Sequence, residues 1–432
     1  MIDPFEARDL LLGEVERLDE EEISVRAALH RTLSSSIHTD RAHPASDNSA
    51  MDGFALRSAD TAGASPERPV KLRIIGESTS AGPFEGSVKG QEAVEISTGG
   101  PVPDGADAIV PVEHTHRSGG RVMSDPSADR DADPGAVQIL REASSGAHIR
   151  PRGEEFFPGD EILPAGIRLN PAAIGLLSSL GHRIVPVFRR PRVLILITGQ
   201  EFVASGDPSA AGDANGPMVD ALCRETGAEV AGVRYVGDAT DALRQVLEEW
   251  APKVDVILST GGASVGPHDL VAEAWEAIGA ETFFWKVAMK PGKPVRAGCV
   301  RLESGRRTIL LALPGNPQSV LAGFETFAEP LLARLAGEPD DTAATVRIPS
   351  ARVLPPDSRT RLLRARIQEG DGSPTLDIPT GQGSGMLRHA ATCPFVAVVP
   401  PSEREIEAGE ILEARPRPEG LAGRSWTPSP DT

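Results

Sequence analysis

Lysine is scarce in this chain and is concentrated in one short segment. The sequence contains six lysines within a combined Lys+Arg count of 44. Three of them, Lys286, Lys290 and Lys293, occur in WKVAMKPGKPV (285–295), around a Pro-Gly turn. Clustered charges usually form a solvated face. In a lysine-poor chain of net charge -18, however, a cluster held by a fixed turn favours the binding of a multiply charged oxyanion.

Four loops that contain glycine follow strand-like segments. They are TGQE (198–201), GD (237–238), STGGASVGPHD (259–269) and LPGNPQS (313–319). In an open α/β sheet, ligands bind beyond the carboxyl ends of the strands. There, glycine lets backbone N–H groups approach a phosphate, and helix starts add partial positive charge. These loops therefore predict an oxyanion site at one edge of a sheet.

The same loops carry carboxylates, namely Glu201, Asp238 and Asp269. Carboxylates do not bind phosphate directly, but they hold a divalent cation that bridges to it. A single glycine-rich loop is more often only a turn, and Asp269 also fits a helix cap. Because several such loops would meet at one edge, the pattern favours a divalent metal beside the oxyanion.

Two further dense motifs lie in the N-terminal half. DNSAMDGFAL (47–56) packs two aspartates into an irregular turn before a strand, and STGGPVPDGADAIVPVE (97–113) has Thr98 and Gly99 in a tight turn. Alone, each motif predicts a structured loop, because turns that fix the backbone conformation also use Asp, Asn and Gly.

Apolar strands that alternate with helices would position the four loops. The expected strands are PRVLILIT (191–198), EVAGVRYVG (229–237), VDVILST (254–260) and RTILLALPG (307–315). Helices are predicted near 215–227 and 239–250, and a third begins after Asn316 as N-cap and Pro317 and extends to about 334. Continuous apolar strands in this alternation indicate βαβ units and a parallel sheet covered on both faces.

The flanking regions have different patterns. Residues 5–33 predict one amphipathic helix, because their apolar residues are spaced for a single face. Residues 45–147 predict a β-rich domain, in which the polar, turn-rich segment 117–136 is expected to form a long hairpin or a mobile loop. After residue 340 the strand pattern returns, and the tail from about 416 is predicted to be disordered.

Bulk composition argues against several classes of protein. A length of 432 residues suggests about three domains at ~150 residues each. The net charge of -18 argues against binding a nucleic-acid backbone over a broad surface. Cys223, Cys299 and Cys393 are odd in number and lack metal-ligand spacing, which favours a reducing compartment. The acidic start is unlike a signal peptide and the longest apolar runs have strand length, so no membrane contact and a cytoplasmic location are expected.

Together the motifs resemble those of the MoeA/gephyrin E-domain family, the molybdenum insertases of molybdenum-cofactor biosynthesis. The matching segments run in order along almost the whole chain: DNSAMDGFAL, STGGPVPDGADAIVPVE, RPRGEEFFPGD, PRVLILITGQE, STGGASVGPHD, VAMKPGKP, LPGNPQS, RLLRARI and GQGSG. The first two motifs in combination are highly specific. The glycine-rich sheet motifs also occur in the smaller molybdopterin adenylyltransferases and discriminate less.

The resemblance implies an α/β multidomain fold. A central, doubly wound, mostly parallel α/β domain of the MogA-like, molybdopterin-binding type is expected, with β-rich N-terminal and C-terminal domains in an elongated subunit. The implied bounds are 1–44 with 148–186 for an elongated helical and linker domain, 45–147 for the β-rich domain, 187–336 for the molybdopterin-binding domain, 337–418 for a C-terminal β-barrel-like domain and 419–432 for a disordered tail. A homodimer with its active site in a cleft between subunits is also implied.

The resemblance further implies a reaction, in which molybdate is inserted into adenylylated molybdopterin with the help of Mg²⁺ and with release of AMP. Matched by motif position, the catalytic residues are Asp52, Thr98, Glu201, Asp238 and Asp269, of which Glu201, Asp238 and Asp269 would hold the metal. The substrate-binding residues are Ser97, Gly261, Gly262, Ser264, Lys286, Lys290, Lys293, Pro294, Pro314, Gly315, Asn316, Ser319, Arg364 and Ser384. Compact ammonium groups suit a small tetrahedral oxyanion better than a planar guanidinium does, which would explain the lysine cluster.

Two positions depart from the family pattern. Gln200 stands where the family has the acid of T-G-D-E, and Glu155 stands where it has the aspartate of R-G-x-D. Gln200 is not an anionic ligand, although its carbonyl oxygen can contribute to a metal site. Glu155 keeps the charge with a longer reach.

Three other functions stay open at the level of sequence. A divergent, non-catalytic paralogue that binds molybdopterin or molybdate fits the change at Gln200. Adenylyl transfer to molybdopterin fits the sheet motifs but leaves the 185 residues before the sheet without a role. A scaffold role, for which eukaryotic gephyrin uses this fold, gains no specific support, because the sequence shows neither a fused second enzymatic domain nor a long linker.

Overall fold

The computed structural model of the chain describes residues 1–118, 135–204, 212–262, 270–339, 345–369 and 373–417. Residues contact each other mainly within two compact units of the chain. Unit 1 contains residues 1–35, 165–174 and 184–432, and unit 2 contains residues 36–164 and 175–183. Within the described ranges, unit 1 carries two six-stranded sheets and unit 2 carries one.

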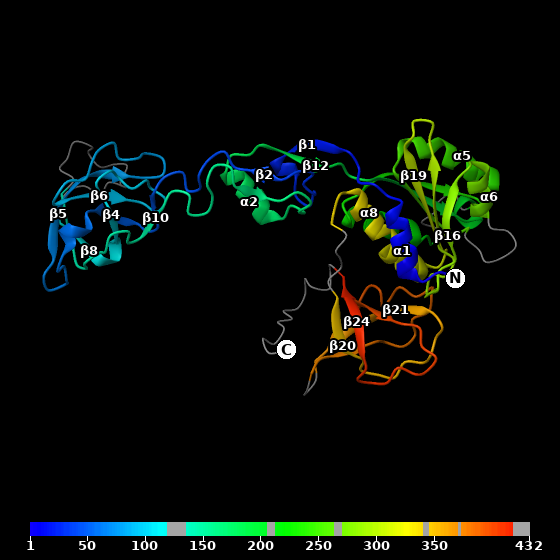
Figure 1. Cartoon of the computed structure of the whole chain (residues 1–432). Helices are drawn as coiled ribbons and strands as arrows, with labels where there is room; N and C mark the ends of the chain where they lie inside the picture. Colours follow the sequence, from blue (N-terminus) through cyan, green and yellow to red (C-terminus); the bar gives the residue numbers. More distant parts are fainter. Residues whose placement is uncertain (119–134, 205–211, 263–269, 340–344, 370–372, 418–432) are drawn as a thin grey trace. The chain divides into compact units, whose positions relative to one another are not determined.

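The first sheet of unit 1 confirms the predicted α/β domain (Figure 1). Its order is β14-β13-β15-β19-β18-β16. The strands are β13 (Arg192–Thr198), β14 (Glu229–Val236), β15 (Val256–Thr260), β16 (Glu281–Trp285), β18 (Arg296–Arg301) and β19 (Arg307–Leu313). The first four in this order run parallel, and β18 and β16 are antiparallel additions.

Helices cover both faces of this sheet, which explains the continuous apolar strands. One face packs against α1 (Pro4–Gly13), α4 (Asn215–Glu225), α7 (Pro317–Gly323), the π-helical turn η5 (Phe324–Ala328) and α8 (Glu329–Leu335). The other face packs against α5 (Thr240–Trp250) and α6 (Leu270–Ala277). Along β13, Ile195 and Ile197 enter the first core, whereas Leu194 and Leu196 enter the second. The domain is therefore doubly wound, as expected.

The second sheet of unit 1 is formed mainly by the C-terminal part of the chain. Its order is β17-β21-β23-β24-β20, and β22 pairs with β21. The strands are β17 (Met289–Lys290), β20 (Val346–Pro349), β21 (Thr360–Gln368), β22 (Thr375–Asp377), β23 (Phe395–Val399) and β24 (Ile411–Pro416). Because β17 lies between β16 and β18 in the sequence, the lysine segment belongs to the connection that joins the two sheets.

Unit 2 is built around a mostly antiparallel sheet of order β7-β4-β6-β5-β9-β8. Its strands are β4 (Gly53–Leu56), β5 (Val70–Ser78), β6 (Glu92–Ile96), β7 (Ala108–Pro111), β8 (Thr115–Ser118) and β9 (Ala136–Ile139). β8 and β9 pair antiparallel on either side of residues 119–134, which lie outside the described residues. The strand pattern of this region was therefore predicted correctly.

Short two-stranded sheets complete the fold. In unit 2, β3 (Asn48–Ser49) pairs with β10 (Ile149–Arg150), and β2 (Ile37–His38) pairs with β11 (Glu161–Leu163). In unit 1, β1 (Glu20–Ser24) pairs with β12 (Ile184–Phe188). The helix α2 spans Pro171–Ser179.

The prediction of one helix over residues 5–33 is wrong. Asp3 caps α1 by accepting the N–H of Phe5 at 2.8 Å, and the helix ends at Gly13. The following β1 is extended because it pairs with the distant β12. Leu10, one of the apolar residues whose spacing predicted that helix, is 42% exposed. Local periodicity was therefore outweighed by pairing with a strand far away in the sequence.

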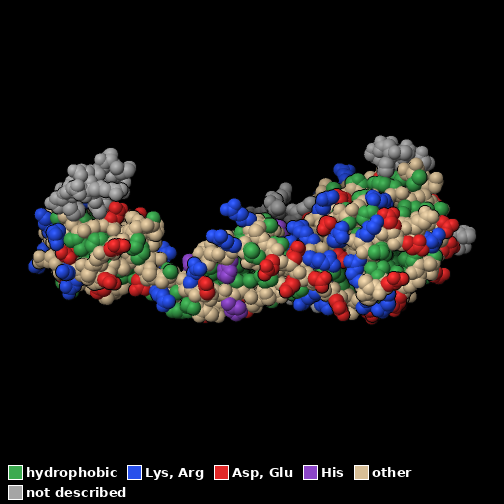
Figure 2. All heavy atoms as spheres, turned by 90° about the horizontal axis from the view of Figure 1, so that it is seen from above, with side chains coloured by type: hydrophobic (Ala, Val, Ile, Leu, Met, Phe, Trp, Pro, Cys, Tyr) green, Lys and Arg blue, Asp and Glu red, His purple; other side chains and the backbone are tan. Residues whose placement is uncertain are grey.

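The charge of the chain is dispersed. On the face drawn in Figure 2, basic and acidic side chains are interspersed over both units. No described helix is long and apolar enough to cross a membrane.

Candidate functional site

Two of the three predicted metal-binding carboxylates lie at neighbouring strand ends. Glu201 is in α3 (Gln200–Ala204), directly after β13, and Asp238 follows the adjacent β14. The Gly199 N–H donates to the Val236 carbonyl at 3.1 Å, and the Gln200 N–H points at Oδ2 of Asp238 at 3.4 Å. Both carboxylates are exposed. The sheet therefore brings Glu201 and Asp238 to one edge, as the loop pattern predicted.

The third carboxylate, Asp269, and the predicted substrate residue Ser264 lie outside the described residues. Within the described part of the chain, no group of three or more His, Cys, Asp or Glu side chains could hold a metal ion. Gln200, which replaces the family acid, lies beside Gly237 and Asp238. A Cβ built on Gly237 would be 2.5 Å from its Oε1.

The loop after β15 requires glycine because it lies close to the end of β13, and the loop after β19 lies beside it. Gly261 has φ +81, and a Cβ there would lie 2.6 Å from Oγ1 of Thr198. Gly262 also has a positive φ, +65. A Cβ on Gly315 would be 3.6 Å from Cα of Gly261. The predicted residues Gly261, Gly262 and Gly315 therefore share one backbone cluster.

Buried oxygens without partners lie around this cluster. The Asn215 side-chain N–H donates to the Gly315 carbonyl at 2.7 Å. No described group donates to Oδ1 of Asn215, Oγ1 of Thr260 or Oε1 of Gln318, although all three side chains are buried. Because an unmet buried acceptor is costly, this edge is suited to a ligand that carries N–H donors. Asn215, Thr260 and Gln318 were missed as site residues, because ordinary polar residues at strand and helix ends give no sequence signal.

The GQGSG segment docks on the start of α7. The Asn316 side-chain N–H donates to Oγ of Ser384 at 3.1 Å, and the Gln318 N–H donates to the Ser384 carbonyl at 2.9 Å. Pro314, which precedes α7, and Ser319, which is in α7, are both buried. The structure therefore brings Asn316 and Ser384 together, although they are 68 residues apart in the sequence, and Ser319 lies on the same helix start as Asn316.

Arg364 is buried in an ion pair. It is 1% exposed, and its terminal nitrogens donate to both carboxylate oxygens of Glu325 at 2.8 Å. Burial lowers the pKa of Arg364 to about 10. Arg417 also contacts the Glu325 carboxylate. Arg364 was predicted to line the pocket, but its guanidinium is already paired with the carboxylate of Glu325 in the π-helical turn η5.

The lysine turn is fixed by backbone contacts, but its three lysines have different surroundings. The Lys286 N–H donates to the Val295 carbonyl at 3.1 Å, and the Val287 N–H donates to the Lys293 carbonyl at 2.9 Å. Lys286 has φ +65, and its ammonium lies 3.7 Å from the ring centre of Trp285. The neighbouring Pro294 is half-buried.

Lys290 is held by a carboxylate that the sequence did not indicate. Its Nζ donates to Oδ2 of Asp357 at 2.8 Å, and Oδ1 of Asp357 accepts from the backbone and side chain of Arg359 at 3.1 and 3.3 Å. Burial acts to raise the pKa of Asp357, but the hydrogen bond from Lys290 and that from the Arg359 backbone lower it overall. The aspartate therefore competes with any anion for this ammonium group.

The side chains of Lys290 and Arg364 lie on opposite faces of the C-terminal sheet. Lys290 registers with Arg361 in the parallel pair of β17 and β21. Leu362 enters the core shared with the α/β sheet, whereas Ala365 enters the core of the C-terminal domain. Because alternate residues of a strand point to opposite faces, Arg364 shares the side of Leu362, and Arg361 with Lys290 lies on the other. The strands therefore do not bring Lys290 and Arg364 together.

In unit 2, Asp52 and Thr98 form one contact. Oδ1 of Asp52 accepts the backbone N–H of Thr98 at 2.6 Å and its hydroxyl at 3.0 Å. The preceding Ser97 is tied to the sheet, because its N–H donates to the Ser78 carbonyl at 3.1 Å. The two N-terminal motifs thus meet at one loop cluster. The carboxylate of Glu155 lies 3.7 Å from Nε2 of His43.

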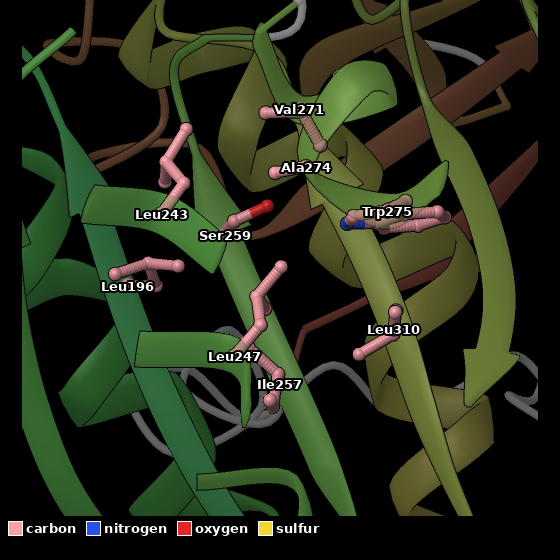
Figure 3. Close-up of a pocket in the computed structure, with 9 residues that line it drawn as sticks. All are labelled: Leu196, Leu243, Leu247, Ile257, Ser259, Val271, Ala274, Trp275 and Leu310. Atoms are coloured by element: carbon pink, nitrogen blue, oxygen red, sulfur yellow. The ribbon is translucent and has the colours of Figure 1, made fainter. Parts of the chain in front are cut away.

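An apolar cavity under the sheet is not part of this site. It measures about 10 Å³ and lies between β13, β15, β19 and the helices α5 and α6 (Figure 3). That volume is roughly the minimum needed for one water molecule. The Ser259 hydroxyl lines it without a described partner. The cavity is therefore a small packing gap in the core and too small for a substrate.

Tyr235 was also missed by sequence reasoning. Its hydroxyl donates to Oδ2 of Asp213 at 3.0 Å, and Asp213 also accepts the N–H groups of Asn215 and Gly216 at the start of α4. Burial and the contact with Asp213 raise the pKa of Tyr235 to about 12. The only tyrosine of the chain thus helps to fix the segment that precedes α4.

Comparisons with known proteins agree with the sequence motifs. Residues 2–181 match the MoeA N-terminal region (domain I and II), and residues 194–334 match the probable molybdopterin binding domain. The molybdopterin molybdenumtransferase of Bacillus subtilis (strain 168) is 31% identical over 396 residues, which are 90% of this chain and 88% of the relative. Molybdopterin molybdenumtransferase 2 of Mycobacterium tuberculosis (strain ATCC 25618 / H37Rv) is 33% identical over 381 residues, which are 86% and 88% of the two chains.

A solved structure shares the fold. The molybdopterin biosynthesis MoeA protein of Pyrococcus horikoshii OT3 matches with a TM-score of 0.77 at 24% identity, over 96% of this chain and 100% of its own. The sequence relatives and the shared fold together cover both units.

Proposed function

We propose, because the chain belongs to the molybdopterin molybdenumtransferase (MoeA) family, that it inserts molybdate into adenylylated molybdopterin and releases AMP. The chain is a transferase of molybdenum cofactor biosynthesis. The observation that carries the finer proposal is the match to two molybdopterin molybdenumtransferases over 86–90% of this chain. The edge of the α/β sheet, with its glycine cluster and exposed carboxylates, supports it.

The unpartnered acceptors support a pterin ligand at this edge. A pterin ring offers amino and amide N–H groups. Oδ1 of Asn215, Oγ1 of Thr260 and Oε1 of Gln318 need donors of this kind. In this proposal Gly261 and Gly315 let the backbone approach the phosphate groups of the substrate; at Gly261 a Cβ would lie only 2.6 Å from Oγ1 of Thr198.

The donor set fits Mg²⁺. Mg²⁺ is commonly bound by one or two carboxylates together with substrate phosphate oxygens and water. Glu201 and Asp238 provide the carboxylates at adjacent strand ends, and Asp269 is proposed as a third from its motif. When bound, the ion would offset the charge of the phosphoanhydride and polarise it for attack. The carboxylates would hold the ion at the end of the sheet, and through it the anhydride.

The lysine turn supplies positive charge for molybdate in this proposal. Lys290 and Lys293 are proposed as its binding groups, together with Ser319 and Ser384. Lys290 must exchange Asp357 for the oxyanion, since its ammonium lies 2.8 Å from Oδ2 of Asp357. We also propose a homodimer, which light scattering on the purified chain would test.

The test is a defined reaction. The purified chain is incubated with adenylylated molybdopterin, molybdate and Mg²⁺, and AMP is quantified by chromatography. AMP together with active cofactor is expected. Asp238→Asn should lower the rate roughly tenfold or more, whereas the control Asp241→Asn, on the exposed side of α5, should not. Loss of AMP release in both variants alike would point to misfolding rather than to the metal site.

Other outcomes identify the competing functions. Binding of the adenylylated substrate without AMP release would indicate a non-catalytic paralogue. Formation of adenylylated molybdopterin from ATP would indicate an adenylyltransferase. Absence of binding to either pterin would contradict the proposal and favour a scaffold.

A further inference from the structure

Asp213 is the centre of a hydrogen-bonded cluster at the start of α4. Ala214, the residue at the N-cap position, has no side-chain oxygen that could accept a helix N–H. Asp213 accepts these groups from one position earlier, because its Oδ1 receives the N–H of Asn215 at 2.9 Å and that of Gly216 at 3.1 Å. The first N–H groups of a helix have no partner within the helix and need one outside it. The carboxylate therefore fixes the backbone of the first two residues of α4.

The hydroxyl of Tyr235 ties this carboxylate to the sheet. Tyr235 belongs to β14, and its hydroxyl donates to Oδ2 of Asp213 at 3.0 Å. Gly216 leaves the space for this contact, because a Cβ there would lie 2.3 Å from Oδ2 of Asp213 and 2.9 Å from the Tyr235 hydroxyl. A hydrogen bond to an ionised carboxylate is stronger than one between neutral groups. The start of α4 is thus held against β14 by one phenol.

Asn215 connects this cluster to the loop after β19. The residue is 8% exposed, and its Nδ2 donates to the Gly315 carbonyl at 2.7 Å. Among the described residues, no group donates to its Oδ1. Because a buried acceptor without a donor is costly, this oxygen is suited to an N–H group of a ligand. Its position depends on Asp213, which holds the Asn215 backbone, and on Gly315, which holds the side chain.

The ring of Tyr235 makes a separate contact with the helix that carries Glu201. Phe202 of α3 lies against it, with the ring centres 6.3 Å apart and the ring planes inclined by 58°. Aromatic pairs at this separation and inclination attract each other beyond their burial of apolar area. Glu201 directly precedes Phe202 in α3. One side chain therefore contacts α3 through its ring and the segment before α4 through its hydroxyl.

We propose that Tyr235 is a positioning residue with two roles, one for each of these parts. Through Asp213, the hydroxyl places Asn215 so that its Oδ1 accepts an N–H group of the pterin. Through Phe202, the ring places the carboxylate of Glu201 at the edge of the sheet. Tyr235 itself does not contact the ligand. The inference rests on the proposed function for the identity of that ligand, adenylylated molybdopterin.

Tyr235→Phe removes the hydroxyl and keeps the ring. Hydrogen exchange of the full chain should become faster at the Asn215 and Gly216 N–H groups and stay unchanged at the Phe202 N–H. The affinity for adenylylated molybdopterin, measured by calorimetry without Mg²⁺, should fall roughly fivefold, because a hydrogen bond that fixes Asn215 is lost. In the AMP-release assay the KM for this substrate should rise by the same factor, while kcat and the Mg²⁺ concentration for half-maximal rate stay unchanged.

Thr226→Val is the matched control, because it also removes one hydroxyl next to α4. The Thr226 hydroxyl donates to the Cys223 carbonyl at 2.8 Å, at the other end of the helix. This variant should leave the exchange at Asn215 and the substrate affinity as they are in the unchanged chain. A loss of affinity equal to that of Tyr235→Phe would mean that any weakening of α4 has this effect, and it would overturn the role of the hydroxyl.

Tyr235→Leu removes the ring as well. Exchange should now also become faster at the Phe202 N–H, which donates to the Gly199 carbonyl at 3.2 Å. The Mg²⁺ concentration for half-maximal AMP release should rise roughly tenfold, as is typical when the support of a metal ligand is lost. An equal Mg²⁺ requirement in Tyr235→Phe and Tyr235→Leu would overturn the role of the ring. Unchanged substrate affinity in Tyr235→Phe would overturn the role of the hydroxyl.

A double-mutant cycle with Asp213→Ala tests the route through this carboxylate. If the hydroxyl acts only through Asp213, Tyr235→Phe should cause no further loss of affinity in the Asp213→Ala chain. Additive losses would overturn this route. The proposed function fails, and the inference with it, if the unchanged chain neither binds adenylylated molybdopterin nor releases AMP. The inference alone fails if the unchanged chain does both and the Tyr235 variants match it.

Discussion

Arg364 and Glu325 face each other in a two-bond ion pair, with both donor–acceptor distances at 2.8 Å. Glu325 serves a second arginine as well, since Arg417 contacts the same carboxylate. Removing either partner of a buried pair is more costly than the net value of the pair, because the charge left behind stays desolvated. The two partners of this pair are therefore not equivalent.

We expect Glu325→Gln to destabilise unit 1 by about 3–5 kcal/mol. Arg364→Met should have a smaller effect, because Glu325 keeps Arg417 as a partner. Urea unfolding followed by tryptophan fluorescence measures this, and the described tryptophans, Trp250, Trp275 and Trp285, belong to unit 1. Glu248→Gln, in an exposed pair with Arg244 on α5, serves as control and should change stability by less than about 1 kcal/mol. Equal effects of Glu325→Gln and Arg364→Met would contradict the shared role of Glu325.

The ionisation of Tyr235 provides a second prediction. Burial and then the hydrogen bond to Asp213 raise its pKa to about 12. A raised pKa of an acid means that the folded chain keeps the proton, so this stabilisation is full below pH ~10 and is lost as the pH rises toward the folded pKa. Because the chain has one tyrosine, tyrosinate absorbance during an alkaline titration measures this group alone.

Asp213→Asn should lower the midpoint of that titration but leave it above ~10, since burial remains. Asp220→Asn, which changes an acid paired with Arg224 on the same helix, is the matched control and should not move it. Circular dichroism at each pH checks that the chain stays folded. A midpoint at the ordinary value in the unchanged chain would show that the contact does not form.

The competition for Lys290 gives a third prediction. Lys290→Met and Lys293→Met should each weaken molybdate binding roughly tenfold, equivalent to about 1.4 kcal/mol. Asp357→Asn should strengthen it, because the ammonium of Lys290 is no longer held by a carboxylate. Calorimetry with molybdate measures all three.

Lys253→Met is the control, because Lys253 pairs with Glu249 at the end of α5 and lies outside the predicted site. Tighter binding in Asp357→Asn with weaker binding in Lys290→Met would link the aspartate and the oxyanion to the same ammonium. Unchanged affinity in both lysine variants would remove the lysine turn from the site.

Gln200 allows a test of the metal proposal by gain of function. Gln200→Asp would place a third described carboxylate beside Glu201 and Asp238. The Mg²⁺ concentration for half-maximal AMP release should fall, since added ligand charge strengthens binding of a hard cation. Gln200→Ala serves as comparison, because it removes the side chain without adding charge. An unchanged Mg²⁺ requirement in Gln200→Asp would argue against metal at this edge.

Sequence reasoning succeeded where one short segment determines its own structure. The centres of β13 and β15 are unbroken apolar runs, VLILI and VIL, so burial on both faces followed directly. Asn316 and Pro317 marked the start of α7 correctly. The positions of Glu201 and Asp238 at one edge followed from the same βαβ rule. The relative arrangement of Asp238 and Asp269 stays a prediction, because Asp269 lies outside the described residues.

Sequence reasoning failed where a residue far away in the sequence determines the local structure or the environment of a side chain. Glu20–Ser24 is a strand because of β12, and no periodicity within the segment indicates that partner. Arg364 carries the same charge in any environment, but its burial is decided by Glu325, which is 39 residues away in the sequence. Lys290 likewise meets Asp357 only because β17 joins the C-terminal sheet. Charged motifs indicate which residues attract anions, but not whether a carboxylate of the chain already occupies them.

The two-residue strand β17 has a consequence for how the lysine turn tolerates change. Met289 is fully buried, and its neighbour Lys290 is paired with Asp357. A slip of one position along β21, such as a single insertion or deletion in the turn would cause, exchanges the faces of these neighbours. An ammonium group would then enter the hydrocarbon interior while a thioether took its place beside the acid. Substitutions in this turn should therefore be tolerated much better than any change in its length.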